Sequence, residues 1–150
     1  MMKKLILLLW LMLGHLSYSL AQDIPADWST SDEIIRVPED PPRFTGCEYI
    51  TDDRSERHQC AQEAAKSFIQ ENLQYPAKAY DHGIEGTVVV TFVIEKDGSI
   101  TDPKLIYGLE EYFGEEALRL ISIMPNWIPG RRRGLVVRTQ FNLPIKFKLD

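Results

Sequence analysis

The chain has 150 residues, of which 44% are hydrophobic and 26% are charged, and its formal net charge is −5. This length suits a single domain with a modest core. Because a net negative charge repels polyanions, the composition argues against nucleic acid as a partner.

The N-terminus has the layout of a secretory signal peptide. Two lysines precede an apolar run over residues 5–13, and small and polar residues then lead to Ala21, an order typical of exported proteins. We predict that residues 1–21 are removed and that the mature chain begins at Gln22. Its charge would be −7, because two lysines are lost from a chain of −5. An uncleaved membrane anchor is the alternative, although the apolar stretch is shorter than the roughly 20 residues that a span prefers.

Residues 22–54 are expected to form an irregular lead-in. Prolines and acidic residues interrupt this segment, and neither the period of a strand nor that of a helix persists. We therefore divide the chain into residues 1–21, this lead-in, and a folded domain over residues 55–150.

Cys47 and Cys60 are the only cysteines. In an exported protein two cysteines first suggest a disulfide, and closing a loop of about a dozen residues contributes about 3 kcal/mol to stability. A metal site is the alternative, because His58 lies two residues before Cys60. The segment lacks the paired C-x-x-C or H-x-x-x-H spacing of metal ligands, so no metal and no cofactor is predicted.

Two helices and a helical turn are predicted from apolar residues that recur every three or four positions. The first helix covers residues 57–72 and ends before Tyr75, because a residue that precedes proline is pushed out of the helical region. Pro76 then begins a short helical turn. The second helix covers residues 112–123 and is ended by Pro125.

A β-hairpin is predicted between the two helices. Residues 87–95 are rich in β-branched and aromatic residues and apolar on both sides of the alternation, which is typical of a buried, central strand. The turn at Asp97 and Gly98 returns the chain into a second strand over residues 100–107. Pro103 removes one backbone donor there and confines that strand to an edge.

The last segment, residues 136–149, has the clearest pattern in the chain. Apolar residues alternate with polar ones, so one face is expected on the core and the other in water. The wet face carries Pro144, which is again typical of an edge strand. The other residues of this face are Val136, Arg138, Gln140, Asn142, Lys146 and Lys148.

These elements predict an α+β fold with a three-stranded antiparallel sheet. If the valine-rich strand is central and the Pro103 strand is one edge, the second helix carries the chain to the opposite edge. The strand order is then second, first, third, that is 2-1-3, with two helices packed on one face.

Three arginines, residues 131–133, fall in the connection before the last strand. Pro129, Gly130 and Gly134 supply turn residues around them. We interpret this run as a solvated loop, and contact with a receptor or a lipid phosphate is the alternative.

Several short motifs occur in an order and spacing that is typical of one family. They are Tyr75-Pro76, Ala79, Gly83, Glu85-Gly86, the strand VVVTFVIEKDGSI, Glu116-Ala117-Leu118, Met124-Pro125, Trp127, Pro129-Gly130, Gly134 and the ending FNLPIKFKL. Together they resemble the C-terminal domain of TonB energy transducers over about residues 73–149. Cys47 and the helix that carries Cys60 resemble an extension of TonB-like proteins from Bacteroidetes.

The resemblance implies a periplasmic domain that binds TonB-dependent outer-membrane transporters. The family pairs its last strand with a short extended segment of the transporter, the TonB box, while inner-membrane motor proteins energise the other end. The expected contact residues are Tyr75, Pro76, Trp127, Val136, Arg138, Gln140 and Asn142. A core role for Tyr75 and Trp127 stays open, because aromatic residues commonly pack in cores.

A long edge strand is itself a template for strand addition, because its outer backbone groups are unpaired. Pairing of the same edge between two copies would give a homodimeric scaffold without energy transduction, which is the alternative function. The lead-in over residues 22–45 spans at most about 85 Å, a short reach for transmitting force. No G-x-S-x-G or H-E-x-x-H motif occurs, so catalysis is not expected.

Overall fold

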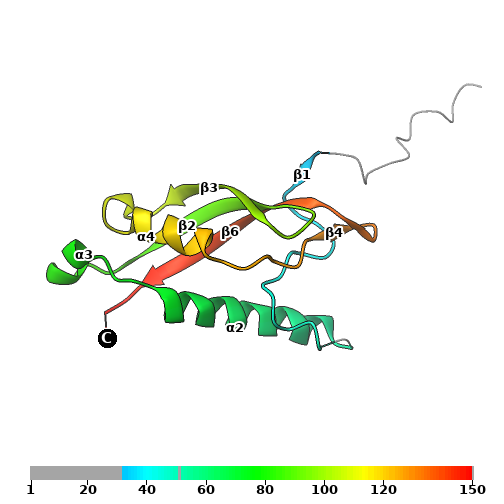
Figure 1. Cartoon of the computed structure of the whole chain (residues 1–150), viewed down its shortest axis with the longest axis horizontal. Helices are drawn as coiled ribbons and strands as arrows, with labels where there is room; N and C mark the ends of the chain where they lie inside the picture. The colour runs from blue at the N-terminus through cyan, green and yellow to red at the C-terminus, as the bar shows by residue number, and fades with distance from the viewer. Residues whose placement is uncertain (1–31, 51, 150) are drawn as a thin grey trace, which may run out of the picture. The chain divides into compact units, whose positions relative to one another are not determined.

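Three helices and six strands make up the part of the chain that a computed structural model describes, residues 32–50 and 52–149 (Figure 1). The predicted signal peptide lies outside the described residues. In chain order the elements are β1 (Ile34–Ile35), α2 (Arg54–Asn72), α3 (Ala77–Asp81), β2 (Gly86–Ile94), β3 (Ile100–Tyr107), α4 (Glu110–Ser122), β4 (Arg131–Arg132), β5 (Leu135–Val136) and β6 (Arg138–Phe147). Within the described ranges, no helix is long and apolar enough to cross a membrane.

The main sheet of the described residues has four strands in the order β1-β6-β2-β3. β6 pairs antiparallel with β2, from Phe147 opposite Gly86 to Thr139 opposite Ile94, and β3 pairs antiparallel with the other side of β2. The predicted order 2-1-3 is therefore found for the three long strands, and β3 with Pro103 is an edge. The prediction of a three-stranded antiparallel sheet is wrong, because β1 adds a fourth strand parallel to β6.

β1 escapes prediction because it has only two residues, Ile34 and Ile35, which are too few for an alternation to show. Its partners are Arg138 and Thr139 at the start of β6. The last long strand is also shorter than predicted. Val136 belongs to β5, which forms a separate two-stranded hairpin with β4.

The core lies between the helices and one face of the sheet. Alternate residues of β2 and β6 enter it, and both long helices cover them, as predicted. The buried side chains of the sheet include Val88, Val90, Phe92, Ile94, Leu143, Ile145 and Phe147, those of α4 include Phe113, Ala117, Leu120 and Ile121, and α2 adds Ala65 and Ile69.

The long helices begin slightly earlier than predicted. α2 begins at Arg54 because Asp53 caps it: the Asp53 carboxylate accepts the backbone N–H groups of Ser55 and Glu56 at 2.7 and 3.2 Å. The Asp53 cap fixes the start of α2 without an apolar residue, so the period of the apolar face does not report it. α4 begins at Glu110 instead of residue 112, and its N-cap residue Leu109 makes no side-chain capping bond.

The described part of the lead-in packs on the sheet and helices. Asp40 and Arg131 exchange backbone hydrogen bonds of 3.0 and 2.8 Å, and a second such pair joins the lead-in to the segment after α4. Phe44 is buried and lies edge-on to Trp127, with ring centroids 5.4 Å apart. This segment therefore contributes to the core as well as to the sheet.

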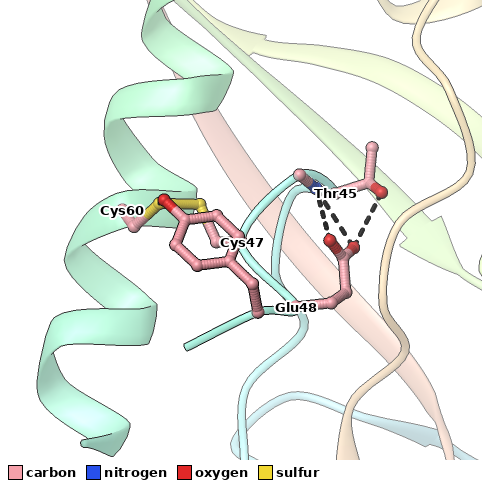
Figure 2. Close-up of a disulfide and its surroundings, with 6 residues drawn as sticks. Thr45, Cys47, Glu48 and Cys60 are labelled. Carbon is pink, nitrogen blue, oxygen red and sulfur yellow. Dashed lines mark hydrogen bonds between the residues drawn. A yellow bond between two sulfur atoms is a disulfide. The ribbon is translucent and has the colours of Figure 1, made fainter. Parts of the chain in front are cut away.

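A disulfide joins Cys47 of the lead-in to Cys60 of α2, as predicted, with the two Cα atoms 6.0 Å apart (Figure 2). Beside it, the Glu48 carboxylate accepts hydrogen bonds from the Gly46 N–H at 2.9 and 3.1 Å and from the Thr45 hydroxyl at 2.8 Å. These hydrogen bonds hold the pKa of Glu48 below its usual value, and the bond from Gly46 contributes most. The turn that carries Cys47 is thereby fixed next to α2.

Removing the disulfide in a Cys47→Ser/Cys60→Ser variant is expected to lower the free energy of unfolding by about 3 kcal/mol, because the bond restricts the unfolded chain. β2, β6 and α4 contain neither cysteine, so far-UV circular dichroism should still report a folded domain. Urea unfolding of the variant beside the oxidised wild type measures the difference. Two free thiols per chain in the unreduced wild type would contradict the bond.

Candidate functional site

The outer edge of β6 is paired over only part of its length. β2 occupies one side of the strand, and β1 on the other side pairs with Arg138 and Thr139. Beyond Thr139, no strand of the described chain pairs with the outer side of β6, which ends at Phe147. The free edge thus begins at residue 140, later than the predicted start at Val136. Unpaired edges of this kind present backbone donors and acceptors to another chain.

Two hydrogen bonds show which amides of β6 face β2. Glu95, just after β2, donates to the Ser99 carbonyl at 2.9 Å across the β2–β3 turn, so odd-numbered amides of β2 face β3 and even-numbered ones face β6. The register pairs those even-numbered residues with odd-numbered residues of β6. Leu149 agrees, since its N–H donates to the Glu85 side chain, just before β2, at 2.6 Å. Odd-numbered amides of β6 therefore face β2.

The even-numbered amides of β6 consequently face outward. Asn142 and Lys146 offer backbone N–H donors on the free edge, and Pro144 between them has none. The carbonyl groups of these three residues point to the same side. Gln140 lies next to the part that β1 covers, and its side-chain amide donates to the Thr91 hydroxyl at 3.1 Å. The free edge thus carries the alternating groups that an added strand requires.

A groove of about 1250 Å³ runs along this edge. α2 lies lengthwise beside the sheet (Figure 1) and forms one wall with Ala61, Ala65 and Ile69. The opposite wall is the edge of β6 itself, at residues 141–144. A smaller groove of about 470 Å³ adjoins it beside residues 36–38. The groove therefore offers a ligand both the unpaired backbone groups of β6 and an apolar face of α2.

The structure brings three of the seven predicted contact residues to the grooves. Asn142 lines both, Gln140 lines the smaller and Trp127 lines the larger. Trp127 is only 4% exposed and packs on three phenylalanines, so most of it belongs to the core. β1 pairs with Arg138, and Val136 lies in the β4–β5 hairpin.

Tyr75 and Pro76 lie elsewhere, between α2 and α3. The Tyr75 ring packs edge-on to Phe113 and Phe147, with centroids 5.9 and 6.0 Å apart. Its hydroxyl donates to the Ile84 carbonyl at 2.6 Å, and burial raises the pKa of the phenol. The lining of the grooves includes neither Tyr75 nor Pro76.

Sequence reasoning missed α2 as a wall of the site. The apolar face of this helix is evident in the sequence, but a helical period does not say which strand the face lies against. The feature of the sequence that could have indicated this wall is the small size of Ala61 and Ala65 on that face, because short side chains leave space beside a sheet edge.

On the face of the sheet opposite the helices, Arg138 is held by acidic residues. Its guanidinium donates to the Glu95 carboxylate at 2.7 and 2.9 Å and to the Asp32 carbonyl at 2.8 Å. The hydrogen bonds from Arg138 lower the pKa of Glu95 against the opposing effect of partial burial, and the Thr101 hydroxyl adds to the lowering. In return, Glu95 raises the pKa of Arg138.

Arg138→Ala is expected to destabilise the domain near neutral pH and to have less effect in acid. The pKa of Glu95 is lower in the folded than in the unfolded state. The ion pair therefore contributes fully above the unfolded pKa and is lost as the pH falls through the folded pKa. Urea unfolding of both proteins at about pH 7 and about pH 3 measures this change, on either side of the usual carboxyl range. A stability difference that is the same at both pH values would contradict the role of the pair.

The arginine run, predicted as a solvated loop, is part of a short hairpin: Arg131 and Arg132 form β4, and Arg133 lies in the turn to β5. The Arg133 N–H donates to the Glu39 carboxylate at 2.9 Å, and the Arg131 guanidinium donates to the Gly134 carbonyl at 3.0 Å. Both arginine side chains are exposed, and Arg132 between them is half-buried. The backbone of the run is thus tied to the lead-in at Arg131 and Arg133.

The described residues contain no group of three or more His, Cys, Asp or Glu side chains that could hold a metal ion. His58, the candidate ligand, lies with its Nε2 atom 3.2 Å from the Asp40 carboxylate. Its neighbour Cys60 is in the disulfide.

The fold and the edge define a class of protein: a small α+β domain that presents an unpaired strand edge beside a helix-lined groove. Residues 71–149 match the family described as Gram-negative bacterial TonB protein C-terminal, and the chain belongs to this family. Proteins of this family are in general interaction domains for outer-membrane transporters. β1, the disulfide and most of α2 precede the matched residues.

Two similar solved structures are NMR solution structures of the TonB C-terminal domain of Helicobacter pylori. Each is 26% identical and covers 59% of this chain, with TM-scores of 0.41 and 0.42, and the matches cover 82% and 96% of those chains. Among curated proteins, none matches this sequence.

Proposed function

We propose that this protein binds a TonB-dependent outer-membrane transporter in the periplasm by accepting an extended transporter segment, the TonB box, as an additional strand beside β6. The observation that carries the proposal is the unpaired outer edge of β6 from residue 140 to Phe147. Family membership supports the class of partner.

Strand addition explains why the edge and the groove occur together. The outward N–H groups of Asn142 and Lys146 and the neighbouring carbonyls would pair with the backbone of the added segment, which supplies affinity with little dependence on sequence. Alternate side chains of that segment would enter the groove against Ala65 and Ile69 of α2. Of the predicted contact residues, Gln140, Asn142 and Trp127 are retained in this proposal.

The proposal includes export of the protein by the signal peptide at residues 1–21. The protein would then be in the periplasm, from which the transporter segment is reached. Transmission of energy from inner-membrane motor proteins requires in addition that the N-terminal segment stays as an anchor. N-terminal sequencing of the mature protein separates the two forms. A chain that begins at Gln22 would favour a soluble binder, whereas an intact N-terminus would favour an anchored transducer.

The same unpaired edge also favours a second function, a homodimer formed by pairing β6 of two copies. Such a dimer would occupy the edge and compete with a transporter segment. Light scattering as a function of protein concentration distinguishes a monomer from this dimer.

The test is a titration of a labelled TonB-box peptide with the protein, followed by fluorescence anisotropy. We expect saturable binding with one peptide per chain and displacement by the unlabelled peptide. Absence of binding at a protein concentration of several hundred micromolar, corresponding to less than about 5 kcal/mol of binding free energy, would overturn the proposal.

A further inference from the structure

The larger groove is cationic on a protein that is acidic as a whole. Its lining contains no Asp or Glu, although the chain carries a net charge of −5. The lining side chains that carry or can acquire positive charge are Arg43, Arg54, His58, Lys66, Lys146 and Lys148. A groove lined by charges of one sign favours a ligand of the opposite charge.

The positive charge at one end of the groove, where Arg43, Arg54 and His58 lie, is partly neutralised within the domain. The Asp40 carboxylate lies 3.1 Å from the Arg43 guanidinium, 3.6 Å from that of Arg54 and 3.2 Å from the His58 ring. Burial opposes ionisation, but the charge of Arg43 and the other contacts outweigh it and lower the pKa of Asp40. Asp40 is therefore ionised at neutral pH and compensates part of this positive charge.

At the other end of the groove, the positive charges of Lys146 and Lys148 are not neutralised in this way. Lys146 and Lys148 are exposed and have no acidic partner among the described residues. Lys66, on α2 across the groove, lies 3.7 Å from Glu63, and both of these side chains are more than 60% exposed, so their pairing is weak. Ammonium groups thus flank the free edge from β6 and from α2.

Between these cations the groove is apolar. Ala61 and Ala65 of α2 face it with short side chains, and Phe141 and Leu143 line it from β6. A strand added to β6 points alternate side chains toward the helices and toward the opposite face. Those on the first side meet the apolar lining, and those on the second lie beside the exposed side chain of Lys146.

We propose that the groove selects an extended partner segment in which apolar residues alternate with acidic ones, an inference that rests on the proposed strand addition. The apolar side chains face α2, and the acidic side chains lie beside Lys146 and Lys148 on the opposite face. Lys66 lies on the helix side and adds only a longer-range attraction, which salt screens. Lys66 precedes the matched residues 71–149, so this selectivity comes in part from a segment outside the family match.

The test compares two labelled peptides that differ only in charge, one of alternating valine and aspartate and one of alternating valine and lysine. Anisotropy titrations with the mature protein should show the acidic peptide binding at least about tenfold more tightly at low salt, with a smaller difference at high salt. Lys146→Glu should reduce this preference by about threefold or more, and Lys66→Glu should reduce it by less, because Lys66 acts on the acidic side chains from the helix side of the groove. Lys104→Glu is the matched control, because it makes the same charge change on the far edge strand β3 and should leave the preference unchanged.

Circular dichroism of each variant checks its fold, which substitutions of these exposed lysines should leave intact. An acidic preference that both groove variants reduce and the β3 variant does not reduce supports the inference. If the two peptides bind alike, or neither binds while the TonB-box peptide does, charge selectivity is overturned and strand addition remains. If neither designed peptide nor the TonB-box peptide binds, both proposals are overturned.

Discussion

Phe147→Ala is expected to lower the free energy of unfolding by about 3 to 5 kcal/mol. The side chain is fully buried near the end of β6, and its ring stacks on Phe113 with centroids 4.1 Å and planes 13° apart. Tyr75 meets the same ring edge-on at 6.0 Å. Truncation removes these contacts and leaves a cavity between α4 and the sheet, which the surrounding side chains can fill only in part.

Two variants of the same strand are the controls for this prediction. Phe141→Ala should cost less than Phe147→Ala, because the Phe141 ring is partly exposed at the groove. Lys146→Ala should change stability by less than about 0.5 kcal/mol, because its side chain points into solvent. Urea unfolding of the three variants gives the comparison. A larger loss for Lys146→Ala than for either phenylalanine variant would mean that the register of β6 is shifted by one residue.

The alternation in β6 is the part of the sequence that predicts the structure best, because a shift of one residue would exchange the two faces of the strand. Leu143, Ile145 and Phe147 are buried, whereas Asn142 and Lys146 are exposed, as the pattern predicts. A pattern of this kind depends only on neighbours in the chain, so a single sequence contains all of it.

Elements that depend on distant parts of the chain could not be predicted in the same way. β1 forms because Ile34 and Ile35 meet the start of β6, and two residues carry no period of their own. The groove forms because α2 lies beside the edge of β6. The apolar period of a helix does not indicate which strand the helix will lie against. Lys66 therefore joins the candidate site only once the chain is folded.

Asn142→Pro is expected to weaken binding of the TonB-box peptide by at least about tenfold while the domain stays folded. The outward N–H of Asn142 is lost, and the proline ring lies where the partner backbone would pair. β6 already holds Pro144 two residues further on with the same outward direction, so the strand accepts proline on this side. Asn142→Ala keeps the amide and should bind within about threefold of the wild type, because the backbone supplies most of the affinity.

Leu143→Pro is the matched control, one residue away and with its amide directed toward β2. There the same substitution removes a bond inside the sheet and an apolar side chain from the core, so it should cost about 3 kcal/mol or more and unfold much of the domain. Circular dichroism and anisotropy on the same samples separate loss of fold from loss of binding. A folded Asn142→Pro variant that binds as tightly as the wild type would exclude strand addition at this edge. Unfolding by both prolines would instead show that the Asn142 amide is engaged within the sheet, and the free edge assigned to β6 would then not exist.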